Sequence, residues 1–176
     1  MKKTINLICV AILFTSILSC GDKKNEQEAI VAPQGMNVLD LSKYGKPFAI
    51  FIPDTSAAKL SIIQQTYGAL DIRVGNNFAL SINEATEDIE LKKKDISEDE
   101  INKFKNYVVQ EAGAIFWESE ITKPEFHFIM NQKIGNTDYS FQEIKTADAE
   151  PFGKEAIQKM FDSAKNIKEI KKEPVS

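Results

Sequence analysis

The chain has few of the residues from which catalytic and metal centres are most often built. Its 176 residues include one histidine, one tryptophan, one arginine and two cysteines. A lone histidine needs partners before it can act as a base or bind a metal. The sequence also contains no nucleophile elbow, P-loop, HExxH or EF-hand motif. We therefore predict that the protein is not an enzyme and that it binds no metal or other cofactor.

Arginine is scarce, and acidic residues outnumber basic ones. Arg73 is the only arginine among 22 basic residues, against 26 acidic residues and a net charge of −4. Arginine side chains are the usual clamps for phosphate and carboxylate groups, so a pocket of that kind is not expected. An acidic chain is also a poor partner for nucleic acid. The composition therefore argues against a nucleic-acid-binding protein.

The chain lacks an apolar run long enough to be a transmembrane helix. Residues 5–18 form its longest apolar stretch, whereas a spanning helix needs roughly 20 residues. Lys2 and Lys3 precede this stretch, and Ser19 and Cys20 follow it. Positive charge, a short apolar core and small residues are the three parts of a secretory signal. Residues 1–19 are therefore predicted to be a signal peptide.

The end of this segment resembles the lipobox of bacterial lipoproteins, usually written Leu-Ala/Ser-Gly/Ala-Cys. Residues 17–20 read Ile-Leu-Ser-Cys, with the small residue and the cysteine in place. The resemblance implies that the Cys20 sulfur receives a diacylglycerol, that the signal is cut before Cys20, and that the new amino terminus is acylated, for example with palmitate. The alternative is a plain secreted protein that is cut nearby.

The lipobox resemblance also implies a location. Gly21 does not resemble an inner-membrane retention signal, so the outer membrane is expected, with the domain facing the periplasm or the cell surface. Cys9 lies inside the signal, so the mature chain would keep Cys20 alone and could form no internal disulfide. A single leftover thiol in an exported protein needs an explanation, and acylation provides one.

Three segments are expected after the signal. Residues 20–36 are polar and are predicted to form the acylated Cys20 and a flexible tether. Residues 37–167 are long enough for a single domain with its own core. Residues 168–176 are charged and are predicted to form a frayed C-terminal tail.

Most of the domain is predicted to be strand. Residues 48–52 are apolar throughout, which is typical of a strand covered on both faces. Alternating residues on either side of 75–77 predict a hairpin with one buried face, and Gly135-Asn136 predicts a second tight turn. The strands expected are 48–52, 60–67, 70–74, 78–82, 115–119, 126–131 and 139–141.

Three helical segments are expected in the domain. Ser97 and Glu100 fit a capping box, and Ile101, Phe104 and Val108 continue at helical spacing, which predicts a helix from about residue 98. The other helical segments expected are residues 87–94, with Thr86 as a possible cap, and residues 156–164, whose apolar residues form one stripe.

The order of strands, helix, strands and helix predicts an α+β domain. Short turns make the sheet mostly antiparallel, with the helices packed on it. This order is similar to the PsbP-like fold over residues 37–167. The resemblance implies an accessory or docking protein more often than an enzyme, and it assigns no functional residue.

His127 is the residue with the most chemistry to offer. On strand alternation it faces away from Phe126 and Phe128, and a carboxylate at Glu125 or Glu143 could lie near it. One alternative is a surface histidine or a core histidine with its hydrogen bonds satisfied. The other is a functional histidine.

A docking patch is the one surface site that the pattern suggests. Phe116, His127 and Ile129 are expected on the second face of two aromatic-rich strands. If the helices leave that face uncovered, these side chains would form a site for a protein partner. If the face is covered, they belong to the core.

The function predicted is that of a lipid-anchored envelope lipoprotein that acts as a non-enzymatic accessory or protein-binding module. Its partners would be the membrane, through the acyl chains on Cys20, and an unknown envelope protein. One alternative is a lipid-anchored immunity or inhibitor protein that neutralises a basic toxin through its acidic charge. Another is a binder of a small apolar ligand between sheet and helix.

Overall fold

The computed structural model describes residues 29–145 and 150–170. The predicted signal peptide and Cys20 lie outside this part, as do residues 21–28 of the predicted tether. The helical elements are η1 (Ser42–Tyr44), α1 (Ile89–Glu98) and α2 (Lys154–Lys165). The strands are β1 (Met36–Asp40), β2 (Phe48–Pro53), β3 (Leu60–Gln64), β4 (Leu70–Val74), β5 (Phe78–Asn83), β6 (Lys103–Glu111), β7 (Ala114–Glu120), β8 (Pro124–Ile134), β9 (Thr137–Glu143) and β10 (Lys168–Glu169).

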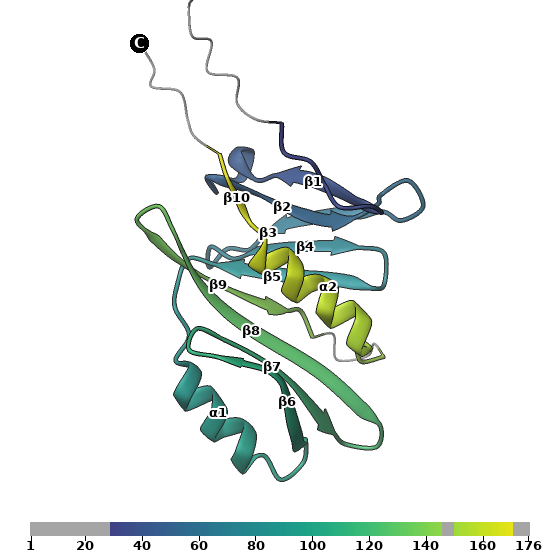
Figure 1. The fold of residues 1–176 in the computed structure, drawn as a ribbon, viewed down its shortest axis with the longest axis vertical. Coiled ribbons are helices and arrows are strands. Elements are labelled where there is room, and N and C mark those ends of the chain that lie inside the picture. Colours follow the sequence, from purple (N-terminus) through teal and green to yellow (C-terminus); the bar gives the residue numbers. More distant parts are fainter. Residues whose placement is uncertain (1–28, 146–149, 171–176) are drawn as a thin grey trace, which may run out of the picture.

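The strands form two antiparallel sheets (Figure 1). The large sheet has seven strands in the order β3-β4-β5-β9-β8-β7-β6. The small sheet has three, with β2 between β1 and β10. Two helices pack on the strands, so the predicted α+β class with a mostly antiparallel sheet is confirmed.

The main core lies where α2 packs on the large sheet and on β2. The predicted amphipathic helix is present, and Ile157, Met160 and Phe161 are fully or almost fully buried on it. The Ser163 hydroxyl donates to the Phe51 carbonyl of β2 at 2.5 Å, which fastens the helix to the small sheet.

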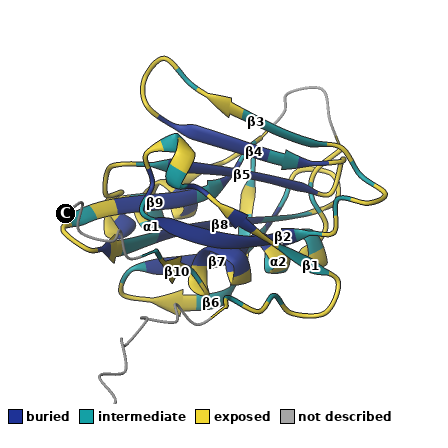
Figure 2. Ribbon diagram, turned by 90° about the horizontal axis from the view of Figure 1, so that it is seen from above, coloured by how far each residue is buried: buried dark blue, intermediate teal, exposed yellow. Residues whose placement is uncertain are grey.

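Figure 2 shows the central strands β5, β8 and β9 largely buried and the edge strands more exposed. Within residues 29–145 and 150–170, no helix is long and apolar enough to cross a membrane.

Strand β2 confirms the prediction of a strand covered on both faces. Phe48 through Ile52 are all buried. The two predicted hairpins are also present, with Gly75 (φ 54°) and Gly135 (φ 59°) in the left-handed conformation that such turns require. The second face of β4 and β5 is more covered than expected, because Asp71 and Ser81 are buried as well.

A second, smaller core covers the opposite face of the large sheet. It joins α1 to β7 and β8, and its buried members are Ile89, Ile96, Ile115, Trp117 and Ile129. Phe104 and Tyr107 of β6 pack against it. Helix α1 therefore shields only the β6–β8 end of this face.

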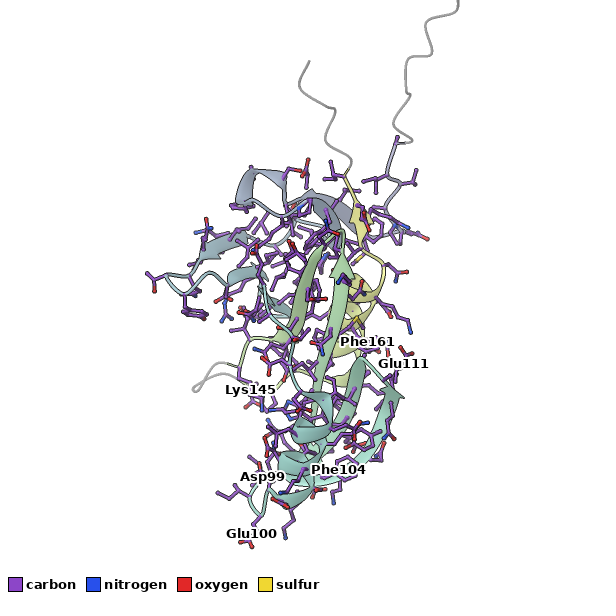
Figure 3. The ribbon with its side chains drawn as sticks, turned by 90° about the vertical axis from the view of Figure 1, so that its left-hand side faces the viewer. Asp99, Glu100, Phe104, Glu111, Lys145 and Phe161 are labelled. Carbon is purple, nitrogen blue, oxygen red and sulfur yellow. The ribbon has the colours of Figure 1, made fainter. Side chains whose placement is uncertain are left out.

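The helix predicted from about residue 98 is wrong. Helix α1 ends at Glu98, and residues 103–111 form the edge strand β6. Figure 3 shows Asp99, Glu100 and Phe104 at this junction. The Asp99 carboxylate accepts the N–H groups of Asn102 (2.8 Å) and Ile101 (2.9 Å), which turns the chain and holds the pKa of Asp99 below its usual range.

The helical spacing of that segment comes from irregular pairing. Strand β6 shifts register against β7 between Phe104 and Asn106 and again between Tyr107 and Val109. Each shift displaces the two-residue alternation of a strand by one position. Apolar residues then recur at intervals of three and four, which is the spacing of a helix.

Two further boundaries differ from the sequence prediction. The first helix is capped by Asp88, whose Oδ1 accepts the Leu91 N–H at 3.0 Å, and not by Thr86. The predicted tail begins with a strand, because Lys168 and Glu169 pair with β2, and the Ile170 N–H donates to the Pro47 carbonyl at 2.8 Å.

Candidate functional site

The site begins where β8 and β9 separate. The last residues that they pair are Ile129 of β8 and Gln142 of β9. Beyond this pair β9 ends at Glu143, whereas the N-terminal part of β8, back to Pro124, remains paired with β7. The N–H of Phe128 would lack a strand partner at this point. It donates instead to Glu143 Oε2 at 2.9 Å. The carboxylate of Glu143 thus completes the hydrogen bonding of the gap between the two strands.

His127 links this carboxylate to β7. Its Nδ1 lies 2.9 Å from Glu143 Oε1, and its Nε2 lies 2.9 Å from Ser119 Oγ. A carboxylate can only accept, so Nδ1 carries the hydrogen in the neutral ring, and Nε2 accepts from the serine hydroxyl. His127 is therefore a buried histidine with both nitrogens hydrogen-bonded, which is the core alternative expected for it.

The hydrogen-bonded series Ser119–His127–Glu143 has the residue types of a serine hydrolase triad. Its serine, however, is more buried than a working nucleophile. The Ser119 side chain is fully buried, and it does not line the neighbouring cavity. A nucleophile must reach the substrate, and the base must reach the proton it removes. The hydrogen bonds therefore fix the positions of His127 and Glu143. The Ser119 hydroxyl does not line the cavity.

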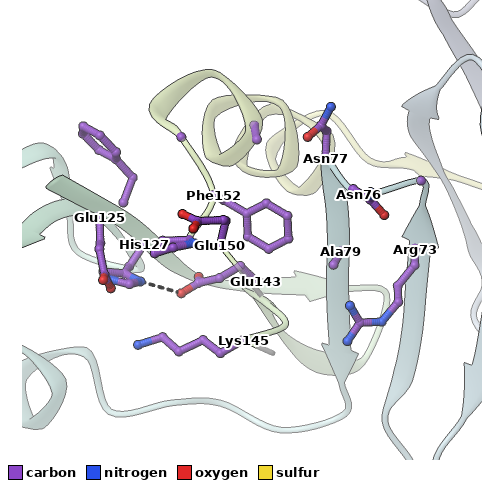
Figure 4. A pocket seen from close by; sticks show the side chains of 15 residues that line it. Arg73, Asn76, Asn77, Ala79, Glu125, His127, Glu143, Lys145, Glu150 and Phe152 are labelled. Carbon is purple, nitrogen blue, oxygen red and sulfur yellow. Dashed lines mark hydrogen bonds and ion pairs between the residues drawn. The ribbon is translucent and has the colours of Figure 1, made fainter. Parts of the chain in front are cut away.

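A cavity of about 820 Å³ lies against this network, between the β4–β5 hairpin, β8 and the start of α2 (Figure 4). His127 and Glu143 form part of its wall. The remaining lining residues are Arg73, Gly75, Asn76, Asn77, Ala79, Glu125, Phe126, Lys145, Glu150, Pro151, Phe152, Gly153 and Ala156. A space of this size is in the range of small-molecule sites.

Charges of both signs line the cavity. Among the described residues, its carboxylates are Glu125, Glu143 and Glu150, and its cations are Arg73 and Lys145. The side chain of Glu125 is only 16% exposed, and its Oε2 lies 3.9 Å from His127 Nε2, beyond hydrogen-bond distance. The cavity can therefore offer a ligand charged groups as well as the apolar surface that the small-ligand alternative requires.

A second, smaller cavity of about 350 Å³ lies on the face of the sheet that α1 leaves open. The residues that line it include Asp71, Ser81 and Gln142 of the sheet and Lys92 of α1. The Gln65 amide donates to Asp71 at 2.6 Å, so this acidic group already has a partner.

The three residues of the predicted docking patch are all covered. Phe116 is 0%, His127 4% and Ile129 2% exposed, so they form no exposed patch. Strand alternation also separates them. Phe116 points into the main core, whereas Ile129 belongs to the second core. His127 lines the large cavity and Ile129 the small one, while Phe116 lines neither.

Sequence reasoning found part of the site. The expectation that Glu125 or Glu143 lies near His127 is met by both, at 3.9 and 2.9 Å. Ser119 carries no signal of its own in the sequence, and only the pairing of β7 with β8 brings it beside His127. The wall formed by Asn76, Asn77 and Phe152 carried no signal in the sequence, because a turn and a loop reach the cavity only through the tertiary fold.

Comparison with protein-family models, with curated proteins and with solved structures finds no match. The part of the chain that the structure describes contains no group of three or more metal-ligating side chains.

Proposed function

We propose that this protein is a lipid-anchored envelope lipoprotein whose domain is a non-enzymatic binding module for a small polar ligand. The observation that carries the proposal is the cavity of about 820 Å³ beside the His127–Glu143 pair. Its wall combines charged groups with aromatic and amide side chains, which is the mixture that orients a bound small molecule. The buried network behind it holds the polar groups in fixed positions.

A cavity supports this proposal better than a surface does. The large apolar side chains that are exposed in the described residues are spread over β1, β3, α1 and several loops, and they are Val31, Val38, Ile63, Tyr67, Leu91, Ile101 and Ile121. Scattered apolar residues are normal on a protein surface, whereas a docking site for a protein gathers them. The proposed partner is therefore a small ligand that reaches an anchored domain.

The cavity is tested by filling it. Ala156 lies in the first turn of α2, is partly exposed, and lines the cavity. We expect Ala156→Phe to abolish the rise in melting temperature that a ligand causes in a screen of amino acids, amines, sugars and nucleotides. The matched control is Glu155→Phe, one residue earlier on the exposed side of the helix. Ligands that stabilise Ala156→Phe as strongly as the parent protein would contradict the assignment of the cavity.

The anchor is tested at Cys20. The Cys20→Ala protein is expected in the soluble fraction, and the parent protein in the membrane pellet, because stable attachment needs acyl chains. A Cys20→Ala protein that still sediments wholly with membranes would contradict the lipid anchor and leave the cavity proposal standing.

A further inference from the structure

We propose that the ligand of the large cavity is a small molecule with a protonated amine, and that Glu125 is the carboxylate that receives this amine. The inference rests on the proposed function, since it needs a ligand in the cavity. It adds the chemical class of that ligand and the residue that selects it.

The argument starts from the partners of the other charged groups in the lining. Glu143 accepts from His127 and from the backbone of Phe128. Glu150 forms an ion pair with Lys123, and Arg73 is engaged as well. Each of these three lining groups therefore already has a partner within the protein.

Glu125 differs from them. Across residues 29–145 and 150–170, no donor lies within hydrogen-bond distance of its carboxylate, and the one basic group within 4.0 Å is His127, whose Nε2 lies 3.9 Å away. Only 16% of the side chain is exposed, and the residue lines the cavity. A partly enclosed carboxylate that receives no hydrogen bond from the protein gains charge-assisted hydrogen bonds when a cationic donor binds beside it. A ligand ammonium would supply both the charge and the hydrogen bonds.

The protein's own nearby groups do not meet this need. The Nδ1 hydrogen of His127 points to Glu143, and its Nε2 accepts from Ser119, so the neutral ring offers no hydrogen to Glu125. Lys145 lines the same cavity, but it is exposed, and in the described chain no ion pair joins it to Glu125. Water can solvate the exposed Lys145 ammonium, whereas the side chain of Glu125 is only partly exposed.

The walls beside Glu125 suit the body of an organic amine. Phe126 and Phe152 line the cavity with it, and Figure 4 shows the Phe152 ring between the start of α2 and the strands. Aromatic rings bind the apolar part of a ligand and attract a neighbouring cation through their faces. Ammonium at Glu125 and hydrocarbon against the two phenylalanines would use both features together.

Phenethylamine and its N-acetyl derivative are the probes that test this inference, because they share a ring and chain and differ in the charge on nitrogen. Binding to the full chain, purified in detergent, is measured by calorimetry and by thermal shift. We expect phenethylamine to bind at least tenfold more tightly than the N-acetyl compound. We expect Glu125→Gln to remove this preference and Glu125→Asp, which keeps the charge, to retain part of it.

Glu118→Gln is the matched control, because Glu118 lies on the adjacent strand, accepts from Asn106 at 3.0 Å, and does not line the cavity. Its preference for the amine should equal that of the parent protein. If neutral or anionic compounds fill the cavity and Glu125→Gln binds them as the parent does, the amine inference is overturned while the proposed function stands. If no compound of the wider screen binds the parent protein, the proposed function itself fails.

Discussion

At the residue scale, Glu143 contributes most to the described site. One of its carboxylate oxygens replaces a strand partner for Phe128, and the other fixes the orientation of the His127 ring. Its side chain is 5% exposed, so both bonds are shielded from water. A group that satisfies two buried donors contributes to stability and to the shape of the cavity wall alike.

Truncation of Glu143 should therefore be severe. We expect Glu143→Ala to lower the free energy of unfolding by about 2–5 kcal/mol, because two buried donors lose their acceptor. Chemical denaturation measures this loss. The control is Glu111→Ala, which removes an exposed ion pair with Lys165 and should cost about 0–1 kcal/mol. Equal losses in the two variants would show that the buried bonds contribute no more than a surface pair.

Tyr139 predicts how stability changes at alkaline pH. Burial raises the pKa of its hydroxyl above the ordinary value of about 10, and Glu84 raises it further. Because the folded-state pKa is the higher one, its contribution to stability is complete below pH about 10 and is lost as pH rises through the folded value.

The Tyr139→Phe variant tests this sign. Its free energy of unfolding should fall less steeply above pH about 10 than that of the parent protein, because no tyrosinate can form at this position. Ultraviolet titration of the folded protein should lose part of its late-ionising absorbance at the same time. An unchanged late step would mean that another tyrosine gives rise to it.

At the element scale, two similar sequence signals lie at opposite ends of α1. Asp88 and Ser97 both precede apolar residues at helical spacing, yet only Asp88 accepts a backbone N–H at a helix start. The Ser97 hydroxyl donates to the Lys94 carbonyl inside the last turn of α1. The same residue types thus serve the beginning of a helix at one position and its end at the other.

This difference predicts a contrast between two alanine variants. Asp88→Ala should lower the free energy of unfolding by about 1 kcal/mol, as loss of a cap does. Ser97→Ala should change it by less than about 0.5 kcal/mol, because its hydroxyl caps no helix start. Urea denaturation of both variants measures the contrast, and a larger loss at Ser97 would restore the capping box that the sequence suggested.

The elements that the sequence predicts correctly are those whose pattern agrees with their surroundings. Residues 48–52 are apolar on both faces and are buried on both, and Gly135 marks a turn that needs positive φ. The segment from Ile101 fails because its pairing with β7 is irregular, and tertiary pairing then overrides the local pattern. Local signals predict regular strands and helices, but they do not show where a strand bulges.

The site was less predictable than the fold because it depends on register. Ser119, His127 and Glu143 come from three different strands, and only the pairing of β7, β8 and β9 makes them neighbours. The sequence offered His127 as the one histidine and two carboxylates as candidates for its neighbour. It could not show that β9 ends at Glu143 and leaves a backbone N–H to be satisfied.

At the scale of the whole molecule, the last described residues close the small sheet. Strand β10 pairs with β2, and Ile167 packs against the main core. A chain that ends after Asn166 lacks both. We expect it to be less stable by about 2 kcal/mol than a chain that ends after Ile170, through lost apolar burial and backbone hydrogen bonds. Thermal and chemical denaturation of the two truncated chains measure the difference, and equal stability would exclude β10 as a structural element.

The position of α2 and β10 near the end of the chain determines when the domain can fold during synthesis. Strand β5 pairs with β9, although the whole middle of the chain lies between them in sequence. Strand β2 contacts α2 and β10, which come only in the final part of the chain. Contacts between such distant segments make folding slow, because each closes a long loop. On the ribosome, β1 and β2 would emerge long before α2 and β10, which leaves one edge of β2 unpaired and its five consecutive apolar residues without the cover of α2. We expect the nascent chain to depend on chaperones until its last residues have been synthesised.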